Sequence, residues 1–205
     1  MSLCEIKEMG HIDYVSDLAE VVKTLEAEKV DSSDFHYERN LMCKVFFAFG
    51  AYCTQKNNRY NLGAESLKNI SFGAINNEGL RKSIRELVPN KEKMRLRVFP
   101  DFYLHESNRS DCINEEEQHL IAEVKTTLRL RKQDFFWDML KLNLYGEQLQ
   151  FKNLVFIIYG TKLKRIEKLI KEYVEKYYSD YISNIYFFVR PSNETRFKIY
   201  NWITD

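Results

Sequence analysis

Apolar residues recur three and four positions apart in several long segments of the chain, which is the spacing of one buried face of a helix. This pattern predicts helices at about 13–29, from the polar cluster 31–34 to Tyr52 or Lys56, at 76–88, at 132–149, and from Thr161 to about Tyr177. Clusters of glycine, proline and asparagine separate several of these segments, as turns and loops require. Amphipathic helices are therefore expected in both halves of the chain.

Shorter apolar runs alternate with these helices and have the length of β-strands. The runs at 153–159 and 184–189 are almost uninterrupted, which is typical of strands buried on both faces. Weaker signals predict a strand near 67–72 and a final edge strand at 196–202. A strand, a helix and a strand in succession imply parallel strands joined by a right-handed crossover. The pattern as a whole predicts an α/β architecture.

Two further strand-like runs, 98–104 and 120–125, carry charged residues where a buried strand should have none. Side chains alternate along a strand, so the first run, which begins near Met94, turns Asp101 away from the face shared by Val98, Pro100, Phe102 and Leu104. In the second run Glu123 and Lys125 lie on the face opposite Leu120, Ala122 and Val124. Pairing of the two strands would bring the carboxylates of Asp101 and Glu123 together. A divalent metal ion would compensate their burial.

Local charge is more informative than the overall charge of the chain. The formal net charge is only +1, which does not by itself mark a nucleic-acid-binding protein. Basic residues nevertheless precede the first charged strand and follow the second: Lys91, Lys93, Arg95 and Arg97, then Lys125, Arg129, Arg131 and Lys132. Both clusters would flank the metal site, where a phosphate backbone would lie. Ordinary solvated surface is the alternative interpretation of each cluster.

The composition bounds the class of protein. With 44% hydrophobic and 14% aromatic residues, the 205-residue chain can bury a substantial core as one domain. No two cysteines form a C-x-x-C pair, so a zinc site is unsupported, and Cys43 is expected to be a core thiol. The N-terminus is polar and acidic, and no apolar run approaches membrane-spanning length. We expect an intracellular, cytoplasmic protein without a membrane partner.

Pro100-Asp101 followed by Glu123-Val124-Lys125 resembles the motif of the PD-(D/E)XK nuclease superfamily, which has the restriction-endonuclease-like fold. The resemblance implies an α/β (α+β-like) core with a central mixed sheet flanked by helices. It also implies that Asp101, Glu123 and the carbonyl of Val124 hold Mg²⁺, with Mn²⁺ as a substitute, and that Lys125 activates or positions the attacking water. The core would span 33–190, within a single domain of 1–205 that adds an N-terminal helical elaboration at 1–32 and the edge strand within 191–205.

The resemblance suggests further site residues outside the motif. Glu38 lies on the apolar stripe of the second helix and is similar to a glutamate that faces the metal in many of these nucleases. The resemblance implies that Glu38 is a further catalytic residue, which would bind a second metal ion or a metal-bound water. A first-turn glutamate favoured by the helix dipole is the equal alternative. A glutamine or tyrosine from the helix after the motif lies near the scissile phosphate in related nucleases, which suggests Tyr145 or Gln148. The residues expected to contact nucleic acid are Arg97, Thr126, Arg129, Arg131, Lys132, Tyr145 and Gln148.

The expected function is Mg²⁺-dependent hydrolysis of phosphodiester bonds. We expect the nucleic-acid partner to be DNA in preference to RNA, and the enzyme to be an endonuclease. The resemblance is also compatible with a homodimer. One alternative is a nuclease-fold module for nucleic-acid binding or assembly that no longer cuts. A further alternative is an RNA endonuclease of the cap-snatching kind, in which a helical histidine, here His36, would be a ligand.

Overall fold

The computed structural model describes residues 2–7, 14–27, 38–56, 60–64, 68–88, 95–106 and 118–203, and these form an α/β fold around one mixed sheet. The sheet has seven strands in the order β1-β9-β8-β7-β6-β5-β2, and β3 and β4 form a separate two-stranded sheet. The strands are β1 (Ser2–Glu5), β2 (Tyr60–Ala64), β3 (Lys68–Ser71), β4 (Arg95–Val98), β5 (Phe102–Glu106), β6 (Gln118–Thr126), β7 (Asn153–Gly160), β8 (Ile185–Pro191) and β9 (Lys198–Ile203). The α-helices of the described residues are α1 (Val15–Ala27), α2 (Glu38–Lys56), α3 (Glu78–Leu87), α4 (Lys132–Leu149) and α5 (Leu163–Val174).

Three parallel strands form the centre of the sheet. β6 pairs with β7 and β7 with β8 in parallel, and the connections run through α4 and α5. β7 is buried along almost its whole length because helices cover both faces of the sheet. The outer pairs, β1 with β9, β8 with β9, β5 with β6 and β2 with β5, are antiparallel. The apolar runs at 153–159 and 184–189 are therefore confirmed as central, buried strands.

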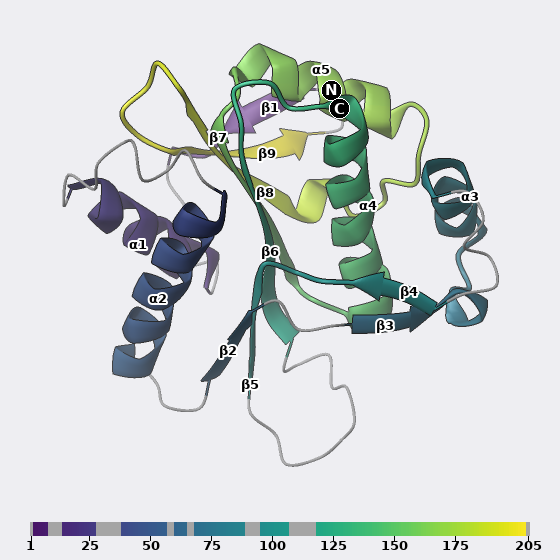
Figure 1. Ribbon diagram of the computed structural model, residues 1–205, viewed down its shortest axis with the longest axis horizontal. Helices are drawn as coiled ribbons and strands as arrows, with labels where there is room; N and C mark the ends of the chain where they lie inside the picture. The colour runs from purple at the N-terminus through teal and green to yellow at the C-terminus, as the bar shows by residue number, and fades with distance from the viewer. Residues whose placement is uncertain are drawn as a thin grey trace.

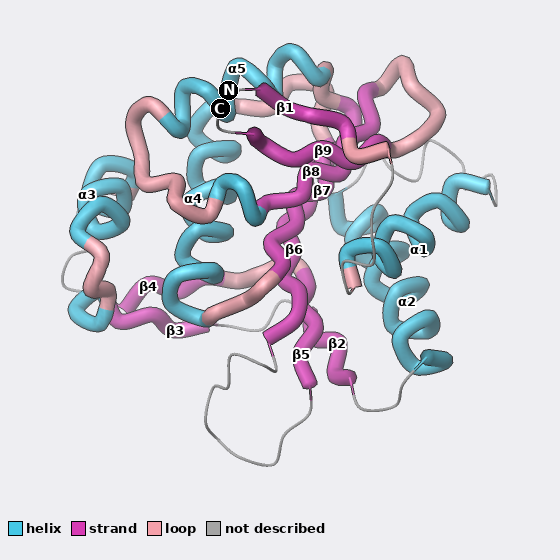
Figure 2. The backbone as a smooth tube through the Cα atoms, turned by 180° about the vertical axis from the view of Figure 1, so that it is seen from behind, coloured by secondary structure: helices cyan, strands magenta, loops and turns pink. Residues whose placement is uncertain are grey.

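Helices pack on both faces of the sheet (Figure 1). The buried side chains between helices and sheet form two hydrophobic cores. α1 and α2 cover one face, and α4 and α5 cover the other, together with α3 and the β3–β4 sheet. Figure 2 shows the same three layers from behind, with the central strands between the helices. Alternation along β6 follows the expectation, since Leu120, Ala122 and Val124 join the α2-side core while Ile121 joins the α4-side core.

The helices agree with the apolar periodicity, but several strand predictions need correction. Residues 98–104 are not one strand: β4 ends at Val98 and pairs with β3, and β5 begins at Phe102. Pro100 lies in the break, where its missing N–H removes no hydrogen bond from a strand ladder. As a result Val98 and Phe102 pack into different cores, so their predicted common face is wrong.

Two predictions about the ends of the sheet are also wrong. β9 is not an edge strand, because β1 pairs along its outer side, and the N-terminal elaboration therefore contains a strand as well as α1. At the other end β2 forms an edge that was not predicted. Its sequence, Tyr-Asn-Leu-Gly-Ala, is short and contains a glycine, which weakens the strand signal, and a Cβ at Gly63 would lie 2.4 Å from the Tyr103 ring.

Some of the predicted features fall on residues that the structure does not describe. The polar cluster 31–34, His36, Lys91, Lys93 and the predicted start of the core at Ser33 lie outside them. Cys43 is partly exposed, whereas Cys53 is the buried thiol of α2, and burial raises the pKa of Cys53 to about 11. Within the described ranges, no helix is long and apolar enough to cross a membrane.

Candidate active site

The pairing of β5 with β6 places Asp101 beside Glu123. Phe102 pairs with Ala122, so the preceding residue Asp101 lies opposite Glu123 in the antiparallel register. Two hydrogen bonds fix Asp101: its amide donates to the carbonyl of Ala122 at 3.1 Å, and its Oδ2 accepts from the amide of Val124 at 2.6 Å. The carboxylate of Asp101 is thus held against the backbone of the Glu-Val-Lys segment.

Glu123 is buried under α4, with 1% of its surface exposed. Its Oε2 accepts from the Lys141 ammonium at 2.5 Å, and its Oε1 accepts from the Tyr145 hydroxyl at 2.9 Å. Both partners come from α4, four residues apart, which places them on one face of that helix. Both carboxylate oxygens of Glu123 are therefore engaged by side chains of this chain.

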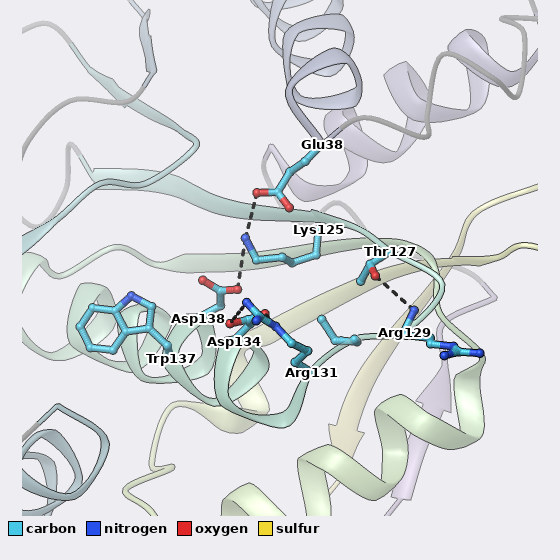
Figure 3. A pocket seen from close by; sticks show the side chains of 9 residues that line it. Glu38, Lys125, Thr127, Arg129, Arg131, Asp134, Trp137 and Asp138 are labelled. Atoms are coloured by element: carbon cyan, nitrogen blue, oxygen red, sulfur yellow. Dashed lines mark hydrogen bonds and ion pairs between the residues drawn. The ribbon is translucent and has the colours of Figure 1, made fainter.

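Lys125 follows on the same face of β6 and bridges the two layers of helices. Its ammonium donates to Glu38 Oε1 at 2.9 Å and lies 3.5 Å from Asp138 Oδ2 (Figure 3). Glu38 is the first residue of α2, and Asp138 lies on α4, so one lysine connects carboxylates from opposite sides of the sheet. The sequence left two equal interpretations of Glu38, a site residue and a first-turn residue favoured by the helix dipole. In the structure Glu38 contacts Lys125.

Asp138 connects Lys125 with Lys141. Its Oδ1 is 2.9 Å from the Lys141 ammonium, and its Oδ2 is a buried atom without a hydrogen-bond partner. Asp138 is 2% exposed. We call Asp101, Glu123, Lys125, Asp138, Lys141 and Tyr145, together with Glu38, the buried charge network.

Burial dominates the electrostatics of this network. Burial raises the pKa of Asp101 to about 6, although the Val124 amide, Lys125 and Lys141 oppose the shift. Burial likewise raises the pKa of Glu123, against the attraction of Lys141. Burial disfavours the charged forms of Lys125 and Lys141, but neighbouring carboxylates outweigh it, so the pKa of each ammonium is raised. Both lysines are therefore cationic at neutral pH.

A cavity of about 530 Å³ opens beside the network. Its lining residues are Glu38, Lys125, Thr127, Arg129, Leu130, Arg131, Asp134, Trp137 and Asp138. Asp101 and Glu123 are absent from this lining. The cavity therefore opens onto the partly exposed Lys125, whereas Asp138, which also lines it, is almost fully buried.

Hydrogen bonds with the end of β7 and with Thr161 fix the turn from β6 into α4. The Thr127 amide donates to the Tyr159 carbonyl at 2.9 Å, and the Thr161 hydroxyl donates to the Thr127 carbonyl at 2.7 Å. Gly160 has φ +92°, and a Cβ there would lie 3.0 Å from the Thr127 carbonyl oxygen, so this approach requires glycine. These contacts fix the backbone just before Arg129 and Arg131, two of the residues that line the cavity.

The predicted nucleic-acid contacts are dispersed in the structure. Arg129 and Arg131 line the cavity, and Arg131 pairs with Asp134 at 2.6 Å. Lys132 pairs with Glu172 on α5 at 2.6 Å, and Thr126 lines a smaller neighbouring pocket of about 200 Å³. Tyr145 is fully buried against Glu123 instead of facing the cavity. Gln148, another predicted contact, is partly exposed. Arg97, the last of them, lies in β4, and its side chain is outside the described part of the structure.

Sequence reasoning missed Asp138 and Lys141. Their signal was present, because Asp138, Lys141 and Tyr145 recur at i, i+3 and i+7 of a helix whose neighbouring positions are apolar. Such a polar stripe within a buried helix indicates a partner on the facing strand. The charged positions of β6 supply that partner.

The donor set suits a divalent cation in charge and chemistry. Four carboxylates of the network face two ammonium groups, one buried Asp138 oxygen lacks a hydrogen bond, and carboxylate oxygens are ligands that Mg²⁺ prefers. As they stand, however, the described residues include no group of three acidic, histidine or cysteine side chains placed to hold a metal ion. The Lys141 ammonium lies between two of the carboxylates instead.

A comparison of the chain with models of known families, with curated proteins and with solved structures finds no match. What the site can do therefore follows from its own geometry and chemistry.

Asp101→Asn is expected to stabilise the metal-free protein at neutral pH. Because the native pKa is about 6 and the ordinary value 3.8, the native state binds more protons than the unfolded state between these values, and stability falls as pH rises through that window. The asparagine keeps the acceptor for Val124 but not the charge, so we expect a gain on the order of 2 kcal/mol at pH 7 and a flatter pH dependence. Urea unfolding in chelator at pH 4 to 7 measures both. An Asp101→Asn protein less stable than wild type at pH 7 would make Asp101 an ordinary hydrogen-bonded residue.

Proposed function

We propose that the protein is a Mg²⁺-dependent nuclease that hydrolyses phosphodiester bonds, of PD-(D/E)XK type and acting as a DNA endonuclease. The observation that carries the proposal is the meeting of Asp101, Glu123 and Lys125 at the junction of β5 and β6. The order α2, β5, β6, α4, β7, α5, β8 supports it, because a helix, the motif strands and then alternating helices and strands are expected of the restriction-endonuclease-like core.

The residues have separable roles in this proposal. Asp101, Glu123 and the Val124 carbonyl would hold the metal ion, which when bound supplies Lewis-acid activation of the phosphate and of a water molecule. Lys125 would orient the attacking water and offset the negative charge that develops on the phosphate. Glu38 and Asp138 hold the Lys125 ammonium in place from two sides, so this lysine is already ordered before substrate arrives.

The cavity supports a phosphate-bearing substrate. Arg129, Arg131, Thr127 and Lys125 all line it. Cationic side chains of this kind neutralise phosphates without reading sequence. The preference for DNA over RNA rests on the resemblance in sequence alone.

Cleavage of supercoiled plasmid and of labelled oligonucleotides tests the proposal. Wild-type protein should nick the plasmid with Mg²⁺ or Mn²⁺ and not with chelator, and the double variant Asp101→Asn, Glu123→Gln should be inactive under all conditions. Absence of metal-dependent cleavage of any DNA or RNA substrate would refute it. Preferential cleavage of single-stranded RNA with Mn²⁺ would instead favour the cap-snatching alternative.

The engagement of Glu123 favours a second candidate function, a nucleic-acid-binding or assembly module that does not cut. Lys141 and Tyr145 each engage one Glu123 oxygen, which leaves less room for a metal ion at this carboxylate. Such a module would bind nucleic acid with a salt-dependent affinity and would leave the plasmid intact with either metal.

Glu38→Gln is expected to slow cleavage by about ten-fold without unfolding α2, since residues that orient a catalytic group contribute on this scale. The amide keeps the volume of Glu38 but loses the charge that holds Lys125. Cleavage rates measured across a metal titration test this. Rates equal to wild type at every metal concentration would leave Glu38 as a first-turn residue favoured by the helix dipole.

A further inference from the structure

Lys141 is the most deeply buried lysine of the network and contacts two acidic residues. It is 8% exposed, and its ammonium lies 2.5 Å from Glu123 Oε2 and 2.9 Å from Asp138 Oδ1. One carboxylate comes from β6, while the other comes from α4, the helix of Lys141 itself. The ammonium thus joins helix and strand at the point where the acidic residues face each other.

We propose that Lys141 is the resident cation of this acidic site, and that a divalent ion binds Glu123 only when the Lys141 ammonium moves away. This inference rests on the proposed function, because it concerns how that metal site opens. Lys141 would then set the affinity for metal without being a ligand or a catalytic residue.

Geometry makes the two cations mutually exclusive at Glu123. A bound Mg²⁺ lies about 2.0–2.1 Å from its oxygens, while the ammonium already lies 2.5 Å from Glu123 Oε2. With Oε1 engaged by Tyr145, metal and ammonium would compete for the same oxygen and for the same small volume. Two cations at such a separation repel each other strongly, because buried charges are poorly screened.

Lys141 satisfies the acidic residues only in part. Asp138 Oδ2 remains a buried oxygen without a hydrogen bond, with the Lys125 ammonium at 3.5 Å. An ammonium donates three hydrogen bonds, whereas Mg²⁺ binds six oxygen ligands. A metal ion can therefore contact more of these oxygens than the Lys141 ammonium does. Asp138 is one of the residues that line the cavity, which is the side from which an ion would arrive.

Lys125 is not an equivalent obstacle. Its ammonium donates to Glu38, and its side chain is 20% exposed, compared with 10% for Lys141. Asp101 contributes to its electrostatic surroundings, and the described contacts include no hydrogen bond from Lys125 to Asp101 or Glu123. Lys125 can therefore remain in place while the ion binds, and Lys141 is the cation that must be displaced.

The affinity of metal alone tests the inference, independently of cleavage. Mn²⁺ titrations by calorimetry and by thermal shift compare wild type with Lys141→Gln, Lys141→Met and Lys141→Arg. We expect Mn²⁺ to bind Lys141→Gln and Lys141→Met at least about ten-fold more tightly than wild type, and Lys141→Arg no more tightly, since it keeps the charge. Lys168→Gln on the exposed face of α5 is the matched control and should bind as wild type does.

The possible outcomes separate this inference from the proposed function. Wild type that binds Mn²⁺ as tightly as Lys141→Gln, with binding lost in Asp101→Asn, would overturn the role of Lys141 and leave the metal site standing. Absence of Mn²⁺ binding in wild type and in every folded Lys141 variant would overturn both. Urea unfolding in chelator identifies the folded variants.

A measurement on unmodified wild type covers the case in which the variants do not fold. Acylation of lysines, followed by mass spectrometry, reports how accessible each ammonium is. Saturating Mg²⁺ should increase the labelling rate of Lys141 several-fold and leave that of Lys168 unchanged. Labelling of Lys141 that stays constant or falls while Mg²⁺ binds would overturn the inference.

Discussion

Replacing Lys125 with methionine is expected to lower the rate of phosphodiester cleavage by about 10²–10³-fold, the usual cost of removing one group that stabilises transition-state charge. Methionine keeps most of the side-chain volume and removes the ammonium that Glu38 and Asp138 hold at the cavity. The fold should persist, because Asp138 keeps its contact with Lys141. Initial rates of plasmid nicking at saturating Mg²⁺, with circular dichroism as a check of folding, measure the effect.

The matched control is Lys168→Met, which removes an exposed lysine from α5 and should cut at the wild-type rate. Lys125→Arg should recover part of the activity, since it restores the charge in a different geometry. A Lys125→Met protein that cuts as fast as the Lys168→Met control would remove Lys125 from the reaction.

Glu123→Ala is expected to destabilise the protein by about 3–5 kcal/mol, the range measured when one partner of a buried ion pair is removed. The substitution leaves the Lys141 ammonium with Asp138 alone and the buried Tyr145 hydroxyl without its acceptor. Urea unfolding in chelator gives the free energy, so the result does not depend on metal binding. Glu123→Gln should cost less, because the amide retains a hydrogen-bond acceptor.

Glu172→Ala provides the contrast. Glu172 pairs with two lysines, Lys132 at 2.6 Å and Lys168 at 3.9 Å, whose side chains are largely exposed to solvent. Pairs exposed to solvent contribute little, so we expect a loss of at most about 1 kcal/mol. If the two alanine variants lose equal stability, the buried charge network is not what holds α4 against β6.

The parts of the fold that the sequence predicted are those in which a strong local pattern agrees with the tertiary structure. α4 and α5 have long apolar stripes, and β7 is an unbroken apolar run, so burial and local propensity lead to the same element. β6 was recognisable because its apolar and charged positions alternate between two faces with different surroundings.

The features that the sequence did not reveal depend on partners far away in the chain. The chain breaks at Pro100 because β4 pairs with β3 in a separate sheet. β1 is a strand only because β9 lies beside it. In the site, the motif residues were identifiable by type and spacing. Asp138 and Lys141 were overlooked despite their helical spacing, because charged residues on a helix usually face solvent, whereas the packing of α4 on β6 directs them inward.

The pairing of β1 with β9 also has a consequence for the order in which the molecule assembles. It joins residues 2–5 to 200–203, whereas β8 and β9 pair across a short connection. Closing the longer loop costs roughly 2–3 kcal/mol more in chain entropy, so β1 should dock late in folding and detach early in local unfolding. During synthesis β1 is made before the other described strands, and its neighbour β9 is the last of them to emerge. The amides of β1 should accordingly exchange with solvent sooner than those of β6 and β7, which are joined through one helix.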